Sequence, residues 1–322
     1  MGSTELSSAK LVYIVILNWN AWKDTEECVQ SCRKISYPNY RLLIVDNGSM
    51  DGSEAILRER FPDLELIQTG SNLGFTGGNN AGMRHALQKG ADYIILLNND
   101  TIVDKDFVTA LVAAAEADRS IGMLCSKIYF YDRPDVLWYA GATFYSWLGW
   151  GRHRGYNVLD RGQYDNMEET PRPTGCSLMV TRRLCESVGL LREEMFCYAE
   201  DIDWGMRAAN HGLKIMYVPS SRVWHKVSLS TGGQASGVPL YYSTRNILLC
   251  LDANRPLALP LRVVRYMTVL SAAVFSLFTQ NVRKAAGLKY ILRGASDYFR
   301  GRFGPLIASA NDVRAGVSRG NH

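Results

Sequence analysis

Three short clusters of amide and carboxylate side chains stand out in the first hundred residues of this 322-residue chain. Each cluster directly follows an apolar run with the composition of a buried strand. Asn and Asp are common turn residues, so any one cluster could simply end its strand. Three such clusters at one edge of a sheet would instead line a common polar cleft. The clusters are Asn18-Trp19-Asn20, Asp46-Asn47-Gly48-Ser49 and Asn98-Asn99-Asp100.

A further acidic group lies far along the chain. Glu200, Asp201 and Asp203 open a predicted helix, where the positive end of the helix dipole favours carboxylates. Asp203 and Arg207 are four residues apart, which is the spacing of an ion pair on a helix. This group offers three candidate carboxylates for proton transfer.

The elements that must position these residues alternate between strand and helix. Helices are predicted at 24–34, with Asp24 as the N-cap, at 54–60 and at 83–89. Repeated strand-loop-helix units with continuous apolar strands predict a parallel sheet covered by helices on both faces. In such open sheets, ligands bind outside the carboxyl ends of the strands, where the strand order reverses. This rule favours one common cleft over three unrelated turns.

The middle of the chain, from about 120 to 230, is aromatic and less regular. Mixtures of aromatic residues and glycine, as in 138–156, suit either a core of mixed strands or a platform for sugar rings. Core packing is the default interpretation. Further along, Gly212 is predicted to end the acidic helix, and a strand at 214–218 leads to His225.

Other binding chemistries lack their sequence signatures. The chain has neither the GxGxxG fingerprint of dinucleotide-binding domains nor the GxxxxGK[ST] phosphate loop. Its seven cysteines show no CxxC pair and no metal-binding spacing, so we expect reduced cysteines in a cytosolic compartment. The first ten residues lack the apolar core of a signal peptide and fit a myristoylation pattern only loosely.

Six segments, taken in order, resemble the inverting nucleotide-sugar glycosyltransferases of GT-A family 2, and most of all its bacterial rhamnosyltransferase-type members. The resemblance spans roughly residues 11–230. It implies an α/β GT-A fold, with a Rossmann-like, mostly parallel central sheet flanked by helices. It also implies a catalytic domain at 1–250, with a nucleotide-sugar half at about 11–105 and an acceptor half at about 106–250. The segments are VILNWN, IVDNGSMDGS, NLGFTGGNN, LLNNDT, YAEDIDWGMRAANHG and VWHK.

The resemblance implies a nucleotide-sugar site in the first hundred residues. Asp46 is assigned to the nucleobase of the donor. Asn98 and Asn99 can form hydrogen bonds with the ribose or the diphosphate without adding negative charge that would repel it. The glycine-rich stretch 72–79 is expected to be a loop that approaches the ligand closely and offers backbone amides. Arg245 is expected to clamp a phosphate, with a solvated helix face as the alternative. The full expected set is Asn18, Asn20, Asp46, Asn72, Gly74, Asn79, Asn98, Asn99 and Arg245.

The usual DxD motif of this fold is replaced here by Asn98-Asn99-Asp100. Mg²⁺ or Mn²⁺ often takes only one or two protein carboxylates, so Asp100 alone can serve as the acidic ligand. The resemblance places a second metal ligand at His225. It also implies that Asp201 is the general base for the acceptor hydroxyl, with Glu200 orienting the acceptor or the base. A single catalytic carboxylate favours direct displacement with inversion.

The C-terminal part of the chain is basic. Residues 254–322 carry eleven Lys and Arg against two Asp, or +9, whereas the rest of the chain carries −4. The mostly apolar segment 266–280 is shorter than the ~20 residues of a spanning helix, and Arg262, Arg265 and Arg283 flank it. A basic, amphipathic helical tail at 251–322 is therefore expected at an anionic membrane surface. The alternative is a helical hairpin that packs on the catalytic domain or forms a homodimer.

The resemblance implies an inverting glycosyltransferase. The basic tail and the reduced cysteines predict that it is cytoplasmic and peripheral on the inner face of the cell membrane. The expected donor is dTDP-L-rhamnose, with a UDP-hexose as the alternative, and the expected acceptor is a polyprenyl-diphosphate-linked glycan or a polysaccharide. No nucleic-acid partner is expected. One rival is a nucleotidyltransferase, whose basic glycine-rich signature is missing near the N-terminus. Another is a non-catalytic carbohydrate-binding subunit of a polysaccharide assembly complex, which would need no base.

Overall fold

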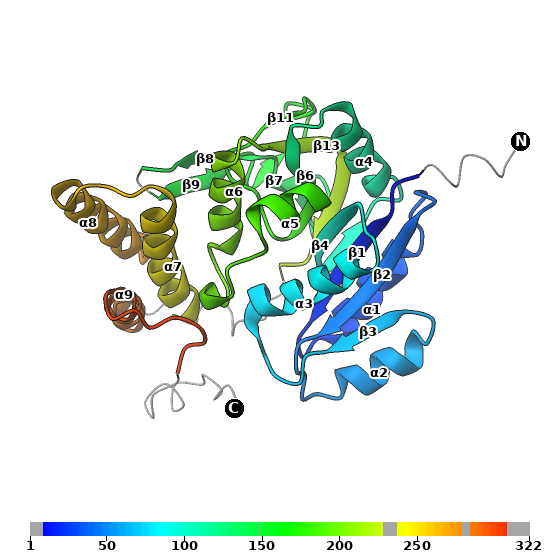
Figure 1. Cartoon of the computed structure of the whole chain (residues 1–322), viewed down its shortest axis with the longest axis horizontal. Helices are drawn as coiled ribbons and strands as arrows, with labels where there is room; N and C mark the ends of the chain where they lie inside the picture. Colours follow the sequence, from blue (N-terminus) through cyan, green and yellow to red (C-terminus); the bar gives the residue numbers. More distant parts are fainter. Residues whose placement is uncertain (1–8, 148, 228–236, 279–283, 308–322) are drawn as a thin grey trace, which may run out of the picture.

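A computed structural model of the chain describes residues 9–147, 149–227, 237–278 and 284–307 (Figure 1). Strands and helices alternate through the first hundred of these residues, and three long helices follow the last strand. The strands are β1 (Val12–Asn18), β2 (Tyr40–Asp46), β3 (Glu65–Gln68), β4 (Tyr93–Asn98), β5 (Thr101–Val103), β6 (Ile121–Phe130), β7 (Val136–Tyr139), β8 (Ala142–Tyr145), β9 (Trp150–His153), β10 (Val158–Leu159), β11 (Glu168–Glu169), β12 (Ser177–Thr181) and β13 (Lys214–His225). The helices are α1 (Trp22–Cys32), α2 (Ser53–Arg60), α3 (Gly74–Gln88), α4 (Phe107–Ala117), α5 (Arg182–Val188), the 3-10 turn η1 (Glu193–Met195), α6 (Glu200–Asn210), α7 (Val238–Asn254), α8 (Leu259–Ser276) and α9 (Lys284–Phe299).

Four parallel strands form the N-terminal part of the main sheet, in the spatial order β3-β2-β1-β4. The chain moves outward from β1 to β3 and then places β4 on the other side of β1, so the strand order reverses between β1 and β4. The register aligns Asn18 with Asp46, and Leu17 with Asn98. The predicted α/β fold is confirmed, and the three polar clusters lie at one sheet edge.

The glycine-rich stretch after β3 is helical, so the prediction of a loop there is wrong. α3 begins at Gly74, well before the predicted start at 83. A Cβ added at Gly78 would lie 2.5 Å from Leu17 Cδ1 of β1. One added at Gly82 would lie 2.4 Å from a methyl carbon of Val15. These glycines let the helix approach the sheet closely, which is a packing role rather than a ligand-binding one.

Antiparallel β12 joins the parallel strands to the second half of the sheet, because it pairs with β4 on one side and β6 on the other. β13 pairs in parallel with β6 and antiparallel with β5. Its last residue, His225, lies opposite Thr101, just beyond the end of β4. The second half of the sheet therefore delivers its residues to the same edge as the polar clusters.

The aromatic middle of the chain contributes both to the core and to the surface. Tyr139 is fully buried in the main core, as the core interpretation predicts. β8 and β9 form a separate hairpin, where the rings of Tyr145 and Trp150 stack with centroids 5.8 Å apart. Both rings are about half exposed.

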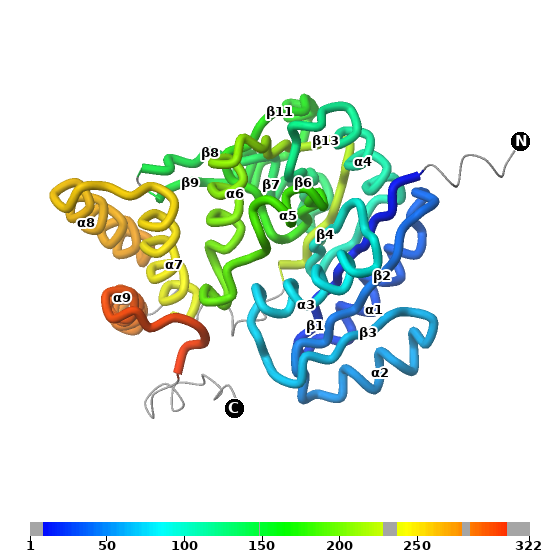
Figure 2. The backbone as a smooth tube through the Cα atoms, viewed as in Figure 1, coloured from blue at the N-terminus to red at the C-terminus, as the bar shows by residue number. Residues whose placement is uncertain are grey.

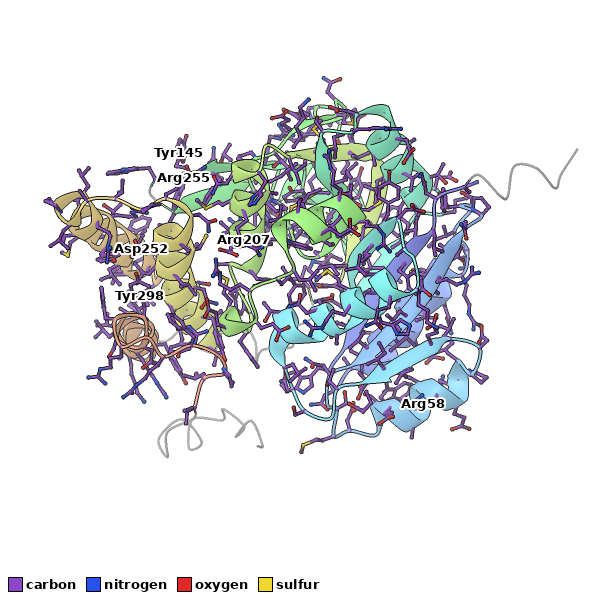
Figure 3. All side chains as sticks on the ribbon, viewed as in Figure 1. Arg58, Tyr145, Arg207, Asp252, Arg255 and Tyr298 are labelled. Carbon is purple, nitrogen blue, oxygen red and sulfur yellow. The ribbon has the colours of Figure 1, made fainter. Side chains whose placement is uncertain are left out.

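α7, α8 and α9 pack together at the side of the molecule away from β1–β3 (Figures 1 and 2). The boundary expected between residues 250 and 251 falls inside α7, so the tail begins as a continuation of that helix. The Asp252 carboxylate of α7 accepts hydrogen bonds from Tyr266 of α8 and Tyr298 of α9. Figure 3 labels Asp252 and Tyr298 within this helical unit. The described part of the tail is thus a helical unit that packs on α7.

Two local predictions are corrected. α1 begins at Trp22, so Asp24 lies within its first turn, where it pairs with Lys226 at 2.8 Å, and is not the N-cap. Arg265 was expected to flank a membrane segment, but it is fully buried and donates to two backbone carbonyls. Asp203 and Arg207 do form the predicted ion pair, at 2.8 Å.

Candidate active site

Asp46 is the centre of a hydrogen-bond network at the end of β2. Its Oδ1 accepts from Asn18 Nδ2 and from Ser49 Oγ, both at 2.6 Å. Its Oδ2 accepts from Gln68 Nε2 at 2.6 Å and from the Ser49 amide at 3.2 Å. Asp46 is fully buried, whereas Ser49 and Gln68 are half-buried. The carboxylate therefore orients the polar groups that line the edge, and Gln68 is a member that sequence reasoning missed.

A chain of hydrogen bonds links this network to the end of β4. Asn18 Oδ1 accepts from Thr25 Oγ1 at 2.7 Å, and Thr25 Oγ1 accepts from Asn99 Nδ2 at 3.0 Å. Asn20 joins the rim, because its backbone amide donates to Ser49 Oγ at 2.9 Å. The predicted residues of β1 and β4 thus meet at the point where the strand order reverses.

Asp100 and His225 face each other beyond the end of β4. His225 Nε2 lies 3.1 Å from Asp100 Oδ1, and both side chains are buried. Trp138 packs edge-on against the imidazole, with ring centroids 4.8 Å apart. Burial by itself would lower the pKa of His225, but the neighbouring Cys176 and Asp100 outweigh it and raise the pKa to about 10.

This pair fits a divalent cation that completes its shell with other ligands. A carboxylate oxygen and an imidazole nitrogen are suitable donors for Mn²⁺, and both can reach one ion when they lie 3.1 Å apart. Within the described ranges, no group of three or more His, Cys, Asp and Glu side chains could hold an ion. An ion here would therefore take phosphate and water oxygens as well.

Glu200 and Asp201 form the start of α6 and differ in their surroundings. Asp201 Oδ2 accepts from the Gly175 amide at 3.3 Å, and its Oδ1 accepts from the Ile202 amide at 2.8 Å. Glu200 is buried, and its Oε2 has no partner among the described residues. Burial, followed by the charge of Asp201, raises the pKa of Glu200 to about 8. Burial also raises the pKa of Asp201, and Arg172 opposes that rise. Two backbone amides and Arg172 thus favour the ionised form of Asp201. Glu200 is mainly neutral near pH 7.

Residues 175 and 176 connect Asp201 to the end of β4. The Gly175 amide donates to Asp201, as described above. The next residue, Cys176, lies against His225, and its carbonyl accepts from the Asn98 amide at 2.9 Å. The start of α6, the Asp100–His225 pair and the end of β4 thus converge around residues 175–176.

Arg172, which lies beside Asp201, and Trp138 and His153, which lie beside His225, carry no motif and were missed from the sequence. Arg172 Nε is buried without a described partner, and its Nη1 makes one long bond, of 3.5 Å, to the Gly151 carbonyl. The ring of His153 packs edge-on against that of Trp138, with ring centroids 4.6 Å apart. Burial, with Arg172, lowers the pKa of His153 to about 3, so its imidazole is neutral. Trp138 lies in β7, His153 ends β9 and Arg172 lies in the loop before β12, so only the folded chain brings the three together.

Two residues expected at the nucleotide sugar lie elsewhere. Arg245 is fully buried, and its guanidinium donates to the carbonyls of Met195 and Gly304, so it does not form the expected phosphate clamp. Asn79 is also buried and donates to the Phe75 carbonyl of its own helix at 2.9 Å. We leave both residues out of the candidate site.

Asn72 and Gly74 lie at the start of α3. Asn72 Oδ1 accepts from the Gly74 amide at 2.8 Å and from Asn47 Nδ2 at 3.2 Å. A Cβ at Gly74 would lie 2.4 Å from the Phe196 carbonyl oxygen. Gly74 therefore makes room for the loop before α6, which brings the start of α3 close to the loop that leads to Asp201.

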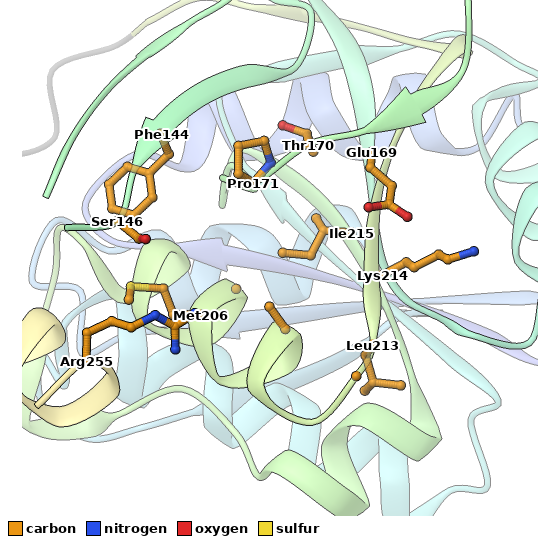
Figure 4. A pocket seen from close by; sticks show the side chains of 13 residues that line it. Phe144, Ser146, Glu169, Thr170, Pro171, Met206, Leu213, Lys214, Ile215 and Arg255 are labelled. Carbon is orange, nitrogen blue, oxygen red and sulfur yellow. The ribbon is translucent and has the colours of Figure 1, made fainter. Parts of the chain in front are cut away.

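A separate pocket of about 440 Å³ lies beside the C-terminal half of α6 (Figure 4). Arg255 and Met206 stand at one side of it, and Glu169 and Lys214 at another. None of the residues predicted for the site lines this pocket. It is therefore distinct from the site at the sheet edge.

Comparison with known proteins places this geometry in context. The profile of the family described as Glycosyl transferase family 2 matches residues 13–186. The dTDP-rhamnosyl transferase RfbF of Shigella flexneri is 25% identical over 273 residues, which cover 80% of this chain and 86% of that protein. An N-acetylglucosaminyl-diphospho-decaprenol L-rhamnosyltransferase of Mycobacterium tuberculosis is 28% identical over 232 residues, which cover 65% of this chain and 74% of that protein.

A solved structure shares the fold at low sequence identity. The mannosyltransferase PcManGT from Pyrobaculum calidifontis, in complex with GDP-Man and Mn²⁺, matches with a TM-score of 0.59 and 16% identity. The match covers 92% of this chain and 89% of that chain. The fold is GT-A, as the sequence predicted.

Proposed function

Because the chain belongs to glycosyl transferase family 2, we propose that it moves a sugar from a nucleoside diphosphate to an acceptor hydroxyl by direct displacement with inversion. The proposed donor is dTDP-L-rhamnose, which the two rhamnosyltransferase relatives support, and a UDP-hexose is the alternative. The observation that carries the proposal is the convergence of Asp201, Asp100 and His225 around residues 175–176.

The donor half binds the nucleotide through groups that the buried network orients. Asp46 fixes Asn18, Ser49 and Gln68, and Thr25 fixes Asn99. Base and ribose hydroxyls are hydrogen-bond partners for such amides and hydroxyls. Because the first three donors are fixed by one carboxylate, they are in place before the nucleotide arrives, which lowers the ordering cost of binding.

Asp100 and His225 would hold Mg²⁺ or Mn²⁺. When bound, the ion supplies positive charge that offsets the charge of the departing diphosphate. The solved neighbour was crystallised with Mn²⁺, which supports this choice of cofactor. His225 would hold the ion as a neutral imidazole, through its ring nitrogen Nε2.

Asp201 acts on the acceptor. Its carboxylate takes the proton of the acceptor hydroxyl as that oxygen bonds to the anomeric carbon, and the bond from that carbon to the diphosphate breaks. Glu200, neutral and with Oε2 free of any described partner, can donate a hydrogen bond that orients the acceptor. Arg172 keeps Asp201 more ionised than burial alone would allow.

We also propose that the acceptor is linked to polyprenyl diphosphate and that α8 lies at the membrane surface. The name of the mycobacterial relative specifies an acceptor of this kind. α8 is 18 residues long, apolar enough to cross a membrane by length and composition, and only 11% of it is buried. Its exposed apolar side chains include Leu259, Leu261, Val263, Val264, Met267 and Phe275.

Donor screening tests the proposal. We expect transfer from dTDP-L-rhamnose, with Mn²⁺ or Mg²⁺, to a prenyl-diphosphate-linked sugar, and little consumption of donor without acceptor. Consumption of a sugar 1-phosphate and a nucleoside triphosphate would instead indicate a nucleotidyltransferase. Sugar binding with no turnover of any donor in the panel would indicate a carbohydrate-binding subunit. Flotation with anionic vesicles tests α8, and a dimer that does not float would contradict the membrane role.

A further inference from the structure

The loop that leads into Glu200 and Asp201 has an uncommon backbone conformation. Phe196, Tyr198 and Ala199 have φ angles of 66°, 68° and 66°. Residues other than glycine persist in this left-handed region only where the surrounding structure imposes it. Ala199 is also the N-cap of α6, so the shape of this loop sets where the first turn of the helix begins.

Two adjacent residues of α7 hold the carbonyls of this loop. Asn246 Nδ2 lies 2.9, 2.8 and 2.8 Å from the carbonyl oxygens of Met195, Cys197 and Tyr198. Arg245 Nη2 donates to the Met195 carbonyl at 3.0 Å, and its Nε donates to Asn246 Oδ1 at 2.9 Å. Both side chains are fully buried. The Met195 carbonyl also accepts from the Cys197 amide at 2.8 Å, whereas the Cys197 and Tyr198 carbonyls accept from α7.

The segment after α9 also contacts Arg245 and the residue just before the loop. Arg245 Nη1 donates to the Gly304 carbonyl at 2.7 Å. The Gly304 amide in turn donates to the Glu194 carbonyl, just before the loop, at 2.7 Å. Tyr242 stacks on Phe196 with centroids 5.5 Å apart and its ring lies under the Arg245 guanidinium. The C-terminal unit therefore touches the loop directly and through Arg245.

The opposite side of the loop rests on the donor half. The Thr76 amide at the start of α3 donates to the Phe196 carbonyl at 3.1 Å. Gly74 gives that carbonyl room, as described above. The loop is therefore clamped between α3 of the donor half and α7 of the C-terminal unit.

We propose that Arg245 and Asn246 are positioning residues for Asp201, and that the segment 303–306, which contacts Arg245 and Tyr242, is part of the same support. The Arg245 guanidinium donates to backbone carbonyls, to the Tyr241 hydroxyl and to Asn246. These contacts hold the loop before α6 and the segment after α9 together, and we call them the clamp. This inference rests on the proposed role of Asp201 as the base. It makes the C-terminal helices necessary for catalysis even when no membrane is present.

Substitutions in the clamp test the proposal against a matched control. In the full chain, Asn246→Ala and Arg245→Lys should lower kcat at least tenfold, while the donor KM and nucleotide affinity stay within about twofold. Arg265→Lys is the control, because Arg265 is also fully buried and also donates to two carbonyls, those of Leu251 and Arg255. Arg265→Lys should lower the melting temperature comparably and leave kcat per folded molecule unchanged.

A glycine pair probes the C-terminal segment alone. Gly304 and Gly301 both have positive φ and open space around an added Cβ, but only Gly304 contacts the Arg245 clamp. Gly304→Ala should lower kcat several-fold, and Gly301→Ala should not. These variants and Arg245→Lys carry the test if Asn246→Ala does not fold.

The outcomes separate two failures. A wild-type chain that transfers no sugar from any donor overturns the proposed function. An active wild type whose folded clamp variants keep kcat, or lose donor affinity in proportion to kcat, overturns the positioning role alone. An equal loss of kcat in Arg265→Lys would likewise reduce the clamp to a general stabilising contact.

Discussion

The proposed donor half and the proposed acceptor half of the site are built in opposite ways. At the donor edge, Asp46 accepts four hydrogen bonds from residues at the ends of the adjacent strands β1 and β3 and from the turn after β2. At the acceptor side, Glu200 Oε2 lacks a described partner, and three left-handed residues lead into α6. The donor edge is satisfied locally, whereas the base depends on contacts from α3, α7 and the C-terminal segment.

This difference suggests a division of labour. A satisfied network is rigid and suits the recognition of a nucleotide. Burial raises the pKa of both Glu200 and Asp201, and carboxyls with raised pKa values suit proton transfer. Changes at the two halves should therefore affect different kinetic constants, and the following substitutions test that separation.

The largest effect is expected for Asp201→Asn. Loss of the general base should lower kcat by about 10²–10⁴-fold. Because Asp201 does not bind the donor network, nucleotide affinity measured by calorimetry should stay near the wild-type value. A variant with weakened nucleotide binding and near-normal kcat would reverse the assignment of the two halves.

Asp46→Asn should weaken nucleotide binding more than it lowers kcat. The amide cannot accept all four hydrogen bonds, and hydrogen bonds to a charged group are worth about 1.5–3 kcal/mol. We expect roughly 10- to 100-fold weaker nucleotide binding, with a smaller change in kcat at saturating donor. Unchanged nucleotide affinity in a folded Asp46→Asn variant would show that the network does not prepare the donor site.

Arg172→Gln should move the pH dependence of transfer. Arg172 opposes the rise in the pKa of Asp201, so its loss lets that pKa rise further. Because the base must be ionised, the acidic limb of kcat/KM should shift to higher pH, with several-fold less activity at pH 6. Arg172→Lys keeps the charge and is the control. Identical pH profiles for Arg172→Gln and wild type would exclude this electrostatic role.

The smallest effect is expected for Glu200→Gln, which should change how the melting temperature depends on pH. The pKa of Glu200 is about 8 in the folded chain, against an ordinary value of 4.5. Between these values the folded state retains a proton that the unfolded state has released, so wild-type stability falls as pH rises through this window. Glutamine does not titrate, so the variant should lose less melting temperature than wild type between pH 5 and 8.5. The exposed Glu59→Gln serves as the control, and parallel curves for Glu200→Gln and wild type would contradict the raised pKa.

The sequence predicted the donor edge well because its signals are local. Asn18, Asp46 and Asn98 each end an apolar strand, and parallel strands bring their ends to one level. The start of α3 was missed because glycine is typical of loops, yet Gly78 and Gly82 serve close helix-sheet packing. Here tertiary packing overrides intrinsic propensity.

The acceptor side was predicted only where a motif marked it. The resemblance indicated Glu200 and Asp201, but neither Arg172 nor the α7 clamp has a local pattern. Arg245 is an example: its nearest loop partner is about fifty positions away in the chain, so sequence alone assigned its charge to a phosphate. Contacts of this range appear only once the chain has folded.

The most direct test of the account is a crystal structure of the chain with a nucleoside diphosphate and Mn²⁺. The account predicts that Asp100 and His225 bind the ion, that the diphosphate completes its shell, and that the Asp201 carboxylate opens onto the same cleft. An ion or a diphosphate bound on a different face from Asp201 would contradict it.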